Sequence, residues 1–121
     1  MNKKDEIIYL AIPYTWNAME AFYVANKVAG RLMKEGYIVF SPISHSHPIA
    51  EHLGQEIQFS HDFWIRQDLP ILRKSDKVIF IVVGDDGMKR IEESKGCQSE
   101  KAEAIKCNIP IEYVKFDLNF K

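Results

Sequence analysis

Hydrophobic residues gather in four short runs along this chain, at residues 7–12, 37–41, 77–83 and 109–114. The runs are rich in β-branched and aromatic residues, which favours strands. The first run contains no charged residue and ends at Pro13, a pattern typical of a central strand that is buried on both faces. Pro42 follows the second run. Pro110 indicates that the fourth strand begins at its proline or lies at an edge of the sheet.

The segments between these runs carry most of the remaining hydrophobic residues, and three of them have helical spacing. Residues 17–35 repeat small and hydrophobic side chains with a period near 3.6, which predicts a helix. Residues 55–73 predict a second helix, kinked or broken at Pro70, and residues 94–107 predict a third. Residues 42–54 are expected to form a long loop at the carboxyl end of the second strand, where loops are more often functional than idle.

Alternation of strands and helices predicts the fold class. Helical crossovers of a dozen or more residues require parallel strands, so we expect a three-layer α/β/α sandwich, flavodoxin-like or Rossmann-like, with a parallel sheet of four to five strands. The length fits a single domain over residues 1–121. Right-handed crossovers bring the carboxyl ends of the strands to one rim. That rim is predicted to hold Pro13, Tyr14, residues 41–47, residues 84–94 and the tail after residue 114.

Composition excludes several kinds of partner. The chain is 46% hydrophobic and 27% charged, with a net charge of −1, so neither nucleic acid nor a membrane is expected as a partner. No hydrophobic run is long enough for a membrane span or a signal peptide. Cys97 and Cys107 are too few for a disulfide or zinc framework. A cytoplasmic protein is the expectation that fits best.

The stretch at residues 94–104 follows the third strand and gathers groups that could bind a ligand. Ser94 is a plausible N-cap, and Gly96 lies in the first turn, where free N–H groups favour anionic or hydroxyl-rich ligands. Glu100 shares a helix face with Ala104, whose small side chain leaves room for a carboxylate to face a pocket. A solvent-facing Glu100 in a polar helix is the simpler interpretation of the spacing. Glu103 is a further alternative for the pocket-facing carboxylate.

Three groups of residues, in this order along the chain, resemble the nucleoside 2-deoxyribosyltransferase-like superfamily. They are Tyr-Leu-Ala-Ile-Pro-Tyr at 9–14, Arg-Gln-Asp-Leu at 66–69 with Ser-Asp-Lys-Val at 75–78, and Ser-x-Gly-x-x-x-Glu-x-x-x-Ala at 94–104 with Asn-Ile-Pro-Ile at 108–111. The loop at 41–48 is similar to that of a small bacterial and phage branch of the superfamily. Together these pieces span nearly the whole chain.

The resemblance implies a glycosyl-transfer site with one carboxylate nucleophile. Glu100 matches the residue that attacks the anomeric carbon, and Tyr9 matches a tyrosine whose hydroxyl steadies that nucleophile. Asp68 matches a second carboxylate that assists the leaving base, as cleavage of an N-glycosidic bond requires. Alternatives remain for each: Tyr9 as an ordinary core residue, and Asp68 in a salt bridge to Arg66, Arg73 or a lysine. Asp76, although part of the family pattern, is interpreted as structural.

The expected substrate contacts are Ala11, Pro13, Tyr14, His45, His47, Ser94 and Gly96. Well-studied transferases have an aspartate where this chain has Ser94; a neutral serine is similar to the branch that accepts 5′-monophosphates. His45 and His47 could contact the substrate, bind a metal, or be unremarkable loop residues, and no clear third metal ligand accompanies them. The turn at residues 84–90 lacks the aromatic residue often seen there, and its Lys89 and Arg90 could reach a phosphate or be simply solvated.

The sequence therefore predicts N-glycosidic bond cleavage or transfer on a (deoxy)nucleoside or its 5′-monophosphate, without a metal or other cofactor. A nucleotide-binding sensor that does not turn over its ligand is the alternative, and the pairing of Glu100 with Asp68 discriminates between the two. Phe59, Phe63 and Trp64 are expected to lie in the core or at a subunit interface. By analogy with the superfamily, a homo-oligomer is expected.

Overall fold

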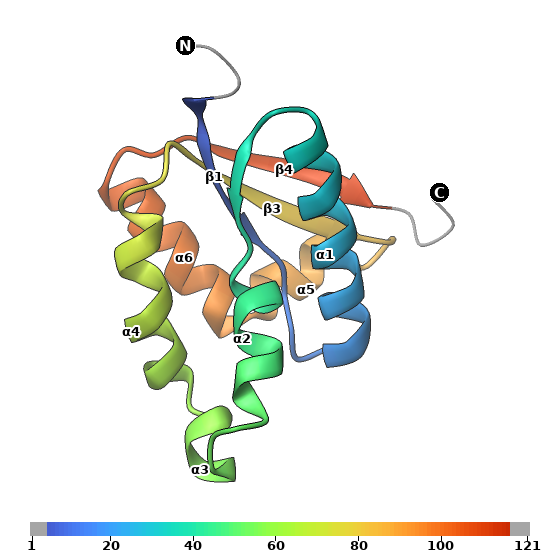
Figure 1. The fold of residues 1–121 in the computed structure, drawn as a ribbon, viewed down its shortest axis with the longest axis vertical. Coiled ribbons are helices and arrows are strands. Elements are labelled where there is room, and N and C mark those ends of the chain that lie inside the picture. Colours follow the sequence, from blue (N-terminus) through green and yellow to red (C-terminus); the bar gives the residue numbers. More distant parts are fainter. Residues whose placement is uncertain (1–4, 117–121) are drawn as a thin grey trace.

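The computed structural model describes residues 5–116. The four strands of this part of the chain form one parallel sheet with the order β2-β1-β3-β4, and helices cover both of its faces (Figure 1). This arrangement confirms the predicted three-layer α/β/α fold. The strands are β1 (Ile7–Ala11), β2 (Ile38–Phe40), β3 (Lys77–Val83) and β4 (Ile111–Phe116). The helices are α1 (Ala18–Lys34), α2 (Pro42–Ala50), α3 (Gln55–Gln58), α4 (His61–Leu72), α5 (Gly87–Glu93) and α6 (Lys95–Lys106).

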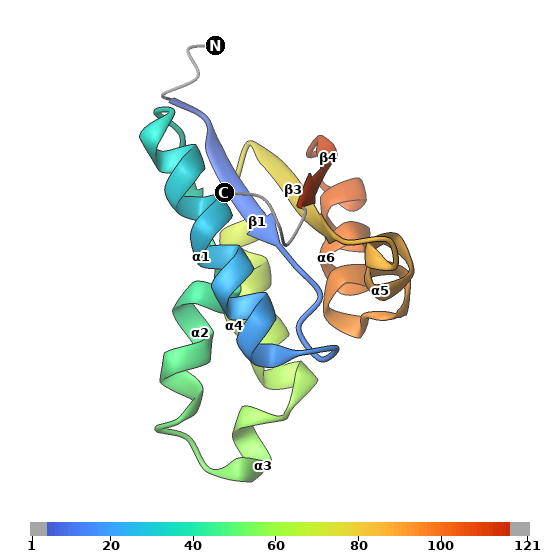
Figure 2. The ribbon, with the colours of Figure 1, turned by 90° about the vertical axis from the view of Figure 1, so that its right-hand side faces the viewer.

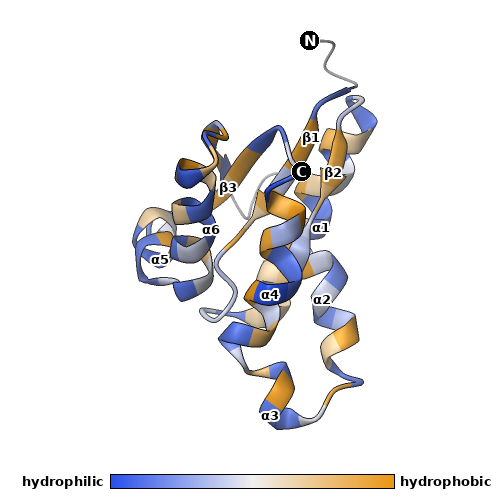
Figure 3. Cartoon of the chain, turned by 90° about the vertical axis from the view of Figure 1, so that its left-hand side faces the viewer, coloured by the Kyte–Doolittle hydropathy of each residue, from blue (hydrophilic) through white to orange (hydrophobic). Residues whose placement is uncertain are grey.

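Each face of the sheet has its own hydrophobic core. Side chains alternate between the two faces along β1, so Ile8 and Leu10 pack on α1 while Tyr9 and Ala11 point to the side of α4, α5 and α6. Figure 2 shows α1 on one side of the sheet and α5 and α6 on the other. The strands β1 and β3 are mainly hydrophobic, whereas α6 is mostly polar (Figure 3). A polar helix beside a hydrophobic sheet buries only a narrow stripe of residues, which makes the buried Glu100 conspicuous.

The amino ends of the two central strands are joined by a carboxylate. Asp76 accepts a hydrogen bond from the backbone N–H of Ile7 at 2.8 Å, and its own N–H donates to the carbonyl of Ile7. This contact agrees with the structural role predicted for Asp76. Asp76 lies at the amino ends of β1 and β3. Ligands of open parallel sheets bind at the other edge, at the carboxyl ends of the strands.

The prediction of a loop over residues 42–54 is wrong for its first part, because Pro42–Ala50 form helix α2. The Ser41 side chain caps this helix by accepting a hydrogen bond from the Ser44 N–H, and Pro42 occupies the first turn, where its missing N–H costs nothing. Pro48 lies near the end of α2 without stopping it. His45 and His47 therefore sit on a helix, two residues apart, and point to different sides of it.

The helix expected over residues 55–73 is also different in the structure. It divides into α3 and α4 at Phe59 and Ser60, and the Ser60 side chain caps α4 by accepting from the Phe63 N–H. Pro70 lies inside the last turn of α4 and does not end it. Ser60 supplies the local start signal, so the break comes ten residues earlier than the proline suggests.

The stretch at residues 84–94, predicted as turn and rim, contains the short helix α5. Gly84 has a φ of 68°, which turns the chain at the end of β3. Gly87 starts α5 so close to the sheet that a Cβ there would lie 2.5 Å from Val82 Cγ1. Among residues 5–116, no helix is long and hydrophobic enough to cross a bilayer.

Candidate active site

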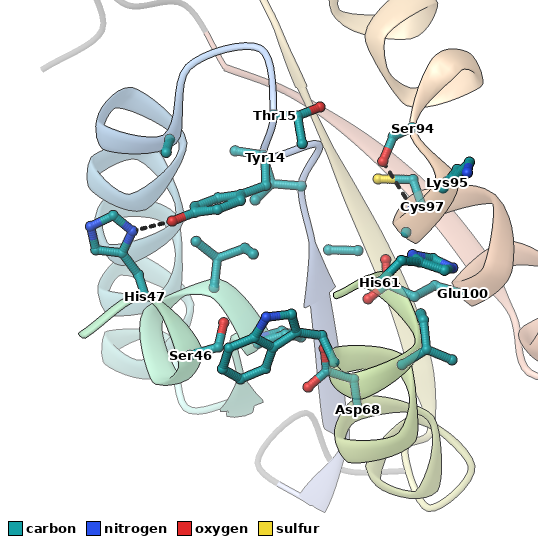
Figure 4. A pocket seen from close by; sticks show the side chains of 18 of the residues that line it. Tyr14, Thr15, Ser46, His47, His61, Asp68, Ser94, Lys95, Cys97 and Glu100 are labelled. Atoms are coloured by element: carbon teal, nitrogen blue, oxygen red, sulfur yellow. Dashed lines mark hydrogen bonds between the residues drawn. The ribbon is translucent and has the colours of Figure 1, made fainter. Parts of the chain in front are cut away.

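A cavity of about 650 Å³ opens at the carboxyl end of the sheet. Its walls come from the loop after β1, from α2, from α4 and the turn before it, and from the first turns of α6 (Figure 4). These segments are far apart in the sequence, and the parallel strands bring them to one rim, as predicted. The volume is in the range of small-molecule sites in proteins.

Glu100 reaches this cavity from the second turn of α6. Ser94 caps the helix by accepting a hydrogen bond from the Cys97 N–H at 3.1 Å, which fixes the start and hence the rotation of α6. With this rotation Cys97, Glu100 and Ala104 form the buried stripe of the helix. Glu100 is only 7% exposed, so the simpler interpretation of a solvent-facing carboxylate is wrong.

The Tyr9 hydroxyl donates a short hydrogen bond to the Glu100 carboxylate. Tyr9 is fully buried in the middle of β1, and its ring packs near Phe40 with the centroids 5.9 Å apart. The phenol is therefore held by the rigid centre of the sheet, and it fixes the position of the carboxylate from below. Tyr9 is thus both a core residue and the hydrogen-bond partner of Glu100.

Asp68 brings a second carboxylate into the same cavity from α4. It is buried, and within residues 5–116 it forms no ion pair or side-chain hydrogen bond; Arg73, one of its predicted partners, instead binds Glu103 at 2.6 Å. Glu103 lies outside the cavity, which leaves Glu100 as its carboxylate from α6. Helices α4 and α6 pack against each other, and the two acidic residues face the cavity from these neighbouring walls.

Burial perturbs every acidic group of this cluster. It raises the pKa of Glu100 to about 8, with the Tyr9 hydrogen bond opposing the rise and the charge of Asp68 adding to it. Burial likewise raises the pKa of Asp68 to about 6. The pKa of Tyr9 lies far above its ordinary value because of burial and the neighbouring carboxylates, so its hydroxyl remains a donor. Near neutral pH, between these two values, the pair therefore holds about one proton, mainly on Glu100.

The wall formed by α2 holds an aromatic pair. The Tyr14 hydroxyl makes a short hydrogen bond with Nδ1 of His47, and the His47 ring stacks on Phe22 of α1 with centroids 4.3 Å apart. Tyr14 and His47 both line the cavity, opposite Ser94 and Cys97 in Figure 4. Burial raises the pKa of Tyr14. This wall therefore offers a phenol and an imidazole as hydrogen-bonding groups.

The other predicted contacts divide into two sets. Ala11, Ser94 and Gly96 line the cavity, with Lys95 beside them at the amino end of α6. Pro13 and His45 do not line it: His45 is exposed and its ring packs near Phe40, with centroids 5.7 Å apart. Among residues 5–116, no three His, Cys, Asp or Glu side chains form a cluster that could hold a metal ion.

The cationic residues after β3 also lie away from the cavity. The Arg90 guanidinium stacks over the ring of Trp16 at 4.4 Å and donates to the carbonyl of Val83. Lys89 is exposed on α5. Neither side chain lines the cavity.

Sequence reasoning missed part of the α4 wall. His61, Trp64, Ile65 and Asp68 all line the cavity, and their spacing of three, four and seven residues places them on one face of the helix. The His61 Nε2 lies 3.3 Å from the Ser99 hydroxyl of α6. Phe59, expected in the core or at a subunit interface, is 80% exposed at the rim of the cavity, so it is not a core residue. The helical spacing from Asp68 back to His61 was the signal that could have found this wall.

The fold and the cavity define an α/β domain with two buried carboxylates near the carboxyl ends of its central parallel strands, one of them bound by a tyrosine of β1. Residues 6–114 match the family described as Domain of unknown function (DUF1937), and the chain belongs to that family. No curated protein matches the chain.

A solved structure supports the resemblance seen in the sequence. The 2-deoxyribosyltransferase from the psychrotolerant bacterium Bacillus psychrosaccharolyticus superposes with a TM-score of 0.62 at 21% identity, over 95% of this chain and 76% of that one. That protein is described as a biocatalyst for the synthesis of nucleosides. At this identity the likeness shows that the two proteins share a fold.

Proposed function

We propose that this protein cleaves or transfers the N-glycosidic bond of a (deoxy)nucleoside or its 5′-monophosphate, with Glu100 as the nucleophile. The observation that carries the proposal is the buried Glu100 carboxylate, held by the Tyr9 hydroxyl and facing a cavity that also contains Asp68. A binding site alone has no need of two buried carboxyl groups without cationic partners, because such groups are costly to bury.

In the first step an oxygen of Glu100 attacks the anomeric carbon of the sugar. The bond from this carbon to the base nitrogen breaks, and an ester bond to Glu100 forms in its place. The transition state has oxocarbenium character, so an ionised carboxylate beneath the anomeric carbon both stabilises the positive charge and captures the sugar. Tyr9 orients the attacking group throughout, because the rest of its side chain is fixed in the sheet.

Asp68 supplies the proton that the departing base nitrogen needs. In the second step a water molecule or another base attacks the same carbon, the ester bond breaks, and the proton of the attacking group returns to Asp68. The reactive form of the pair has Glu100 ionised and Asp68 protonated. In the empty cavity the pKa values, about 8 for Glu100 and about 6 for Asp68, place the single proton of the pair mainly on Glu100 near neutral pH, so the reactive form requires that proton to pass to Asp68.

The test is a panel of purine and pyrimidine nucleosides, in ribose and deoxyribose forms and with or without a 5′-phosphate. We expect at least one compound to release its free base, measured by chromatography, and the monophosphates to react faster than the nucleosides. Ligand binding by calorimetry without base release from any compound would contradict the glycosidic chemistry and favour a sensor.

The phosphate arm of the panel has a matched control in Ser94→Asp. Aspartate caps helices as well as serine does, so α6 keeps its position. Its negative charge at the cavity wall should lower kcat/KM for the monophosphates by about 10-fold relative to the nucleosides. An equal effect on both kinds of substrate would show that Ser94 does not face the phosphate.

A further inference from the structure

Trp64 presents its indole ring to the cavity from the helix that also carries Asp68. The two residues are one turn apart on α4 and therefore lie on the same face, one above the other. A flat ligand stacked on the indole ring would therefore lie beside the part of the wall that carries the Asp68 carboxyl group. This is the position that a leaving base needs if Asp68 protonates it.

The ring is held in a fixed orientation. Its Nε1–H donates to the carbonyl of Gln58 at 2.8 Å, and Phe63 packs beside it in a T-shaped arrangement with centroids 4.9 Å apart. The one polar atom of the indole is therefore already satisfied, so the part of the ring that lines the cavity offers only aromatic surface. Trp64 is nevertheless only half-buried, which leaves that surface accessible.

The turn after β3 supplies no such surface. Residues 84–90 contain no aromatic residue, and Arg90 from this segment is occupied by Trp16. Of the aromatic residues on the cavity wall, Tyr14 is bound to His47, and Phe59 stands at the exposed rim. Trp64 is thus the aromatic side chain that combines a fixed ring with proximity in the helix to Asp68.

We propose that Trp64 is the stacking platform for the heteroaromatic base of the substrate and so restricts the substrates to compounds with a planar base. This inference rests on the proposed function for its substrate class. Stacking of bases on aromatic side chains is tolerant of base identity, because every base has a π-face. Trp64 accordingly selects for a planar ring, and the hydrogen-bonding groups of Tyr14 and Asp68 are left to discriminate among bases.

The first experiment uses Trp16→Phe protein, in which Trp64 is the single tryptophan of the two in the sequence. Titration with adenine, hypoxanthine and cytosine is expected to change the Trp64 fluorescence and to saturate with at least one of them. Ribose 5-phosphate, which has no aromatic ring, is expected to leave the fluorescence unchanged. Binding of a base by calorimetry without any change in Trp64 fluorescence would overturn the inference.

The second experiment compares Trp64→Phe with Trp64→Leu. Phenylalanine keeps a π-face, so base affinity should stay within about 3-fold, whereas leucine should weaken it by about 10-fold or more. Unchanged affinity for ribose 5-phosphate shows that both variants are folded at the sugar end of the cavity. Base release with an unchanged KM in Trp64→Leu would overturn the stacking role and leave the glycosidic chemistry standing. Saturable base binding on Trp64 without turnover of any nucleoside would support the stacking role and contradict the glycosidic chemistry.

Discussion

Replacing Glu100 with glutamine is expected to reduce base release by roughly 10³-fold or more, because removal of an attacking group eliminates the covalent route. Glutamine has nearly the same shape and can still accept the hydrogen bond of the Tyr9 hydroxyl. The cavity should therefore keep its form, and affinity for the free base should change little. The measurement is the single-turnover rate of base release from the best substrate of the panel.

The matched control is Glu103→Gln, one turn further along the same helix. Glu103 pairs with Arg73 outside the cavity, so its loss should leave the rate within about 2-fold of the wild type. A Glu100→Gln variant that releases base at a rate similar to the Glu103→Gln variant would show that Glu100 is not the nucleophile.

The same substitution should make the protein more stable at alkaline pH. The folded state raises the pKa of Glu100 from 4.5 to about 8, so between these values it binds a proton that the unfolded chain does not hold. The free energy of unfolding must then fall as the pH rises through this range, by about 1.4 kcal/mol per pKa unit. Glutamine has no proton to lose, and this part of the pH dependence disappears.

Thermal unfolding of the two proteins at pH 5 and pH 8.5 measures this effect. At pH 5 the Glu100 side chain is neutral in the folded protein, so the wild type and Glu100→Gln should have similar Tm values. At pH 8.5 the variant should unfold about 5 °C or more above the wild type. Asp68 retains its own dependence at lower pH in both proteins. A constant Tm difference across the two pH values would show that the folded protein does not raise the pKa of Glu100.

The central strands were predicted within a residue because β1 and β3 are hydrophobic without interruption and buried on both faces. Helix α2 was missed because two histidines and Pro48 hide its period, and only the Ser41 cap with Pro42 marks its start. The break before α4 was missed because hydrophobic spacing continues across Phe59 and Ser60. In both cases a capping serine sets where the helix begins, and such a residue is a weaker signal in a sequence than a hydrophobic period.

The residues of the candidate site were likewise predicted only in part. Glu100 and Asp68 face one cavity from neighbouring helices, and Tyr9 donates a hydrogen bond to Glu100 from β1. Trp64 was assigned to the core because helical spacing shows only which face points inward. Whether that inward face meets another side chain or an open cavity depends on packing between distant segments, here α2 and α4. For the same reason spacing alone could not show that His45 points away while His47 lines the cavity.

The central claim is that Glu100 forms a covalent bond to the anomeric carbon, and a nucleoside analogue with fluorine at C2 of the sugar tests it most directly. The fluorine withdraws electrons from the oxocarbenium-like transition states and slows both steps, while a good leaving base keeps the first step the faster one. Mass spectrometry of the intact protein is predicted to show a gain of one fluorosugar, located by peptide mapping on Glu100 and absent from Glu100→Gln. Steady release of base from the natural substrate, with the analogue leaving Glu100 unmodified or labelling another residue, would contradict the account.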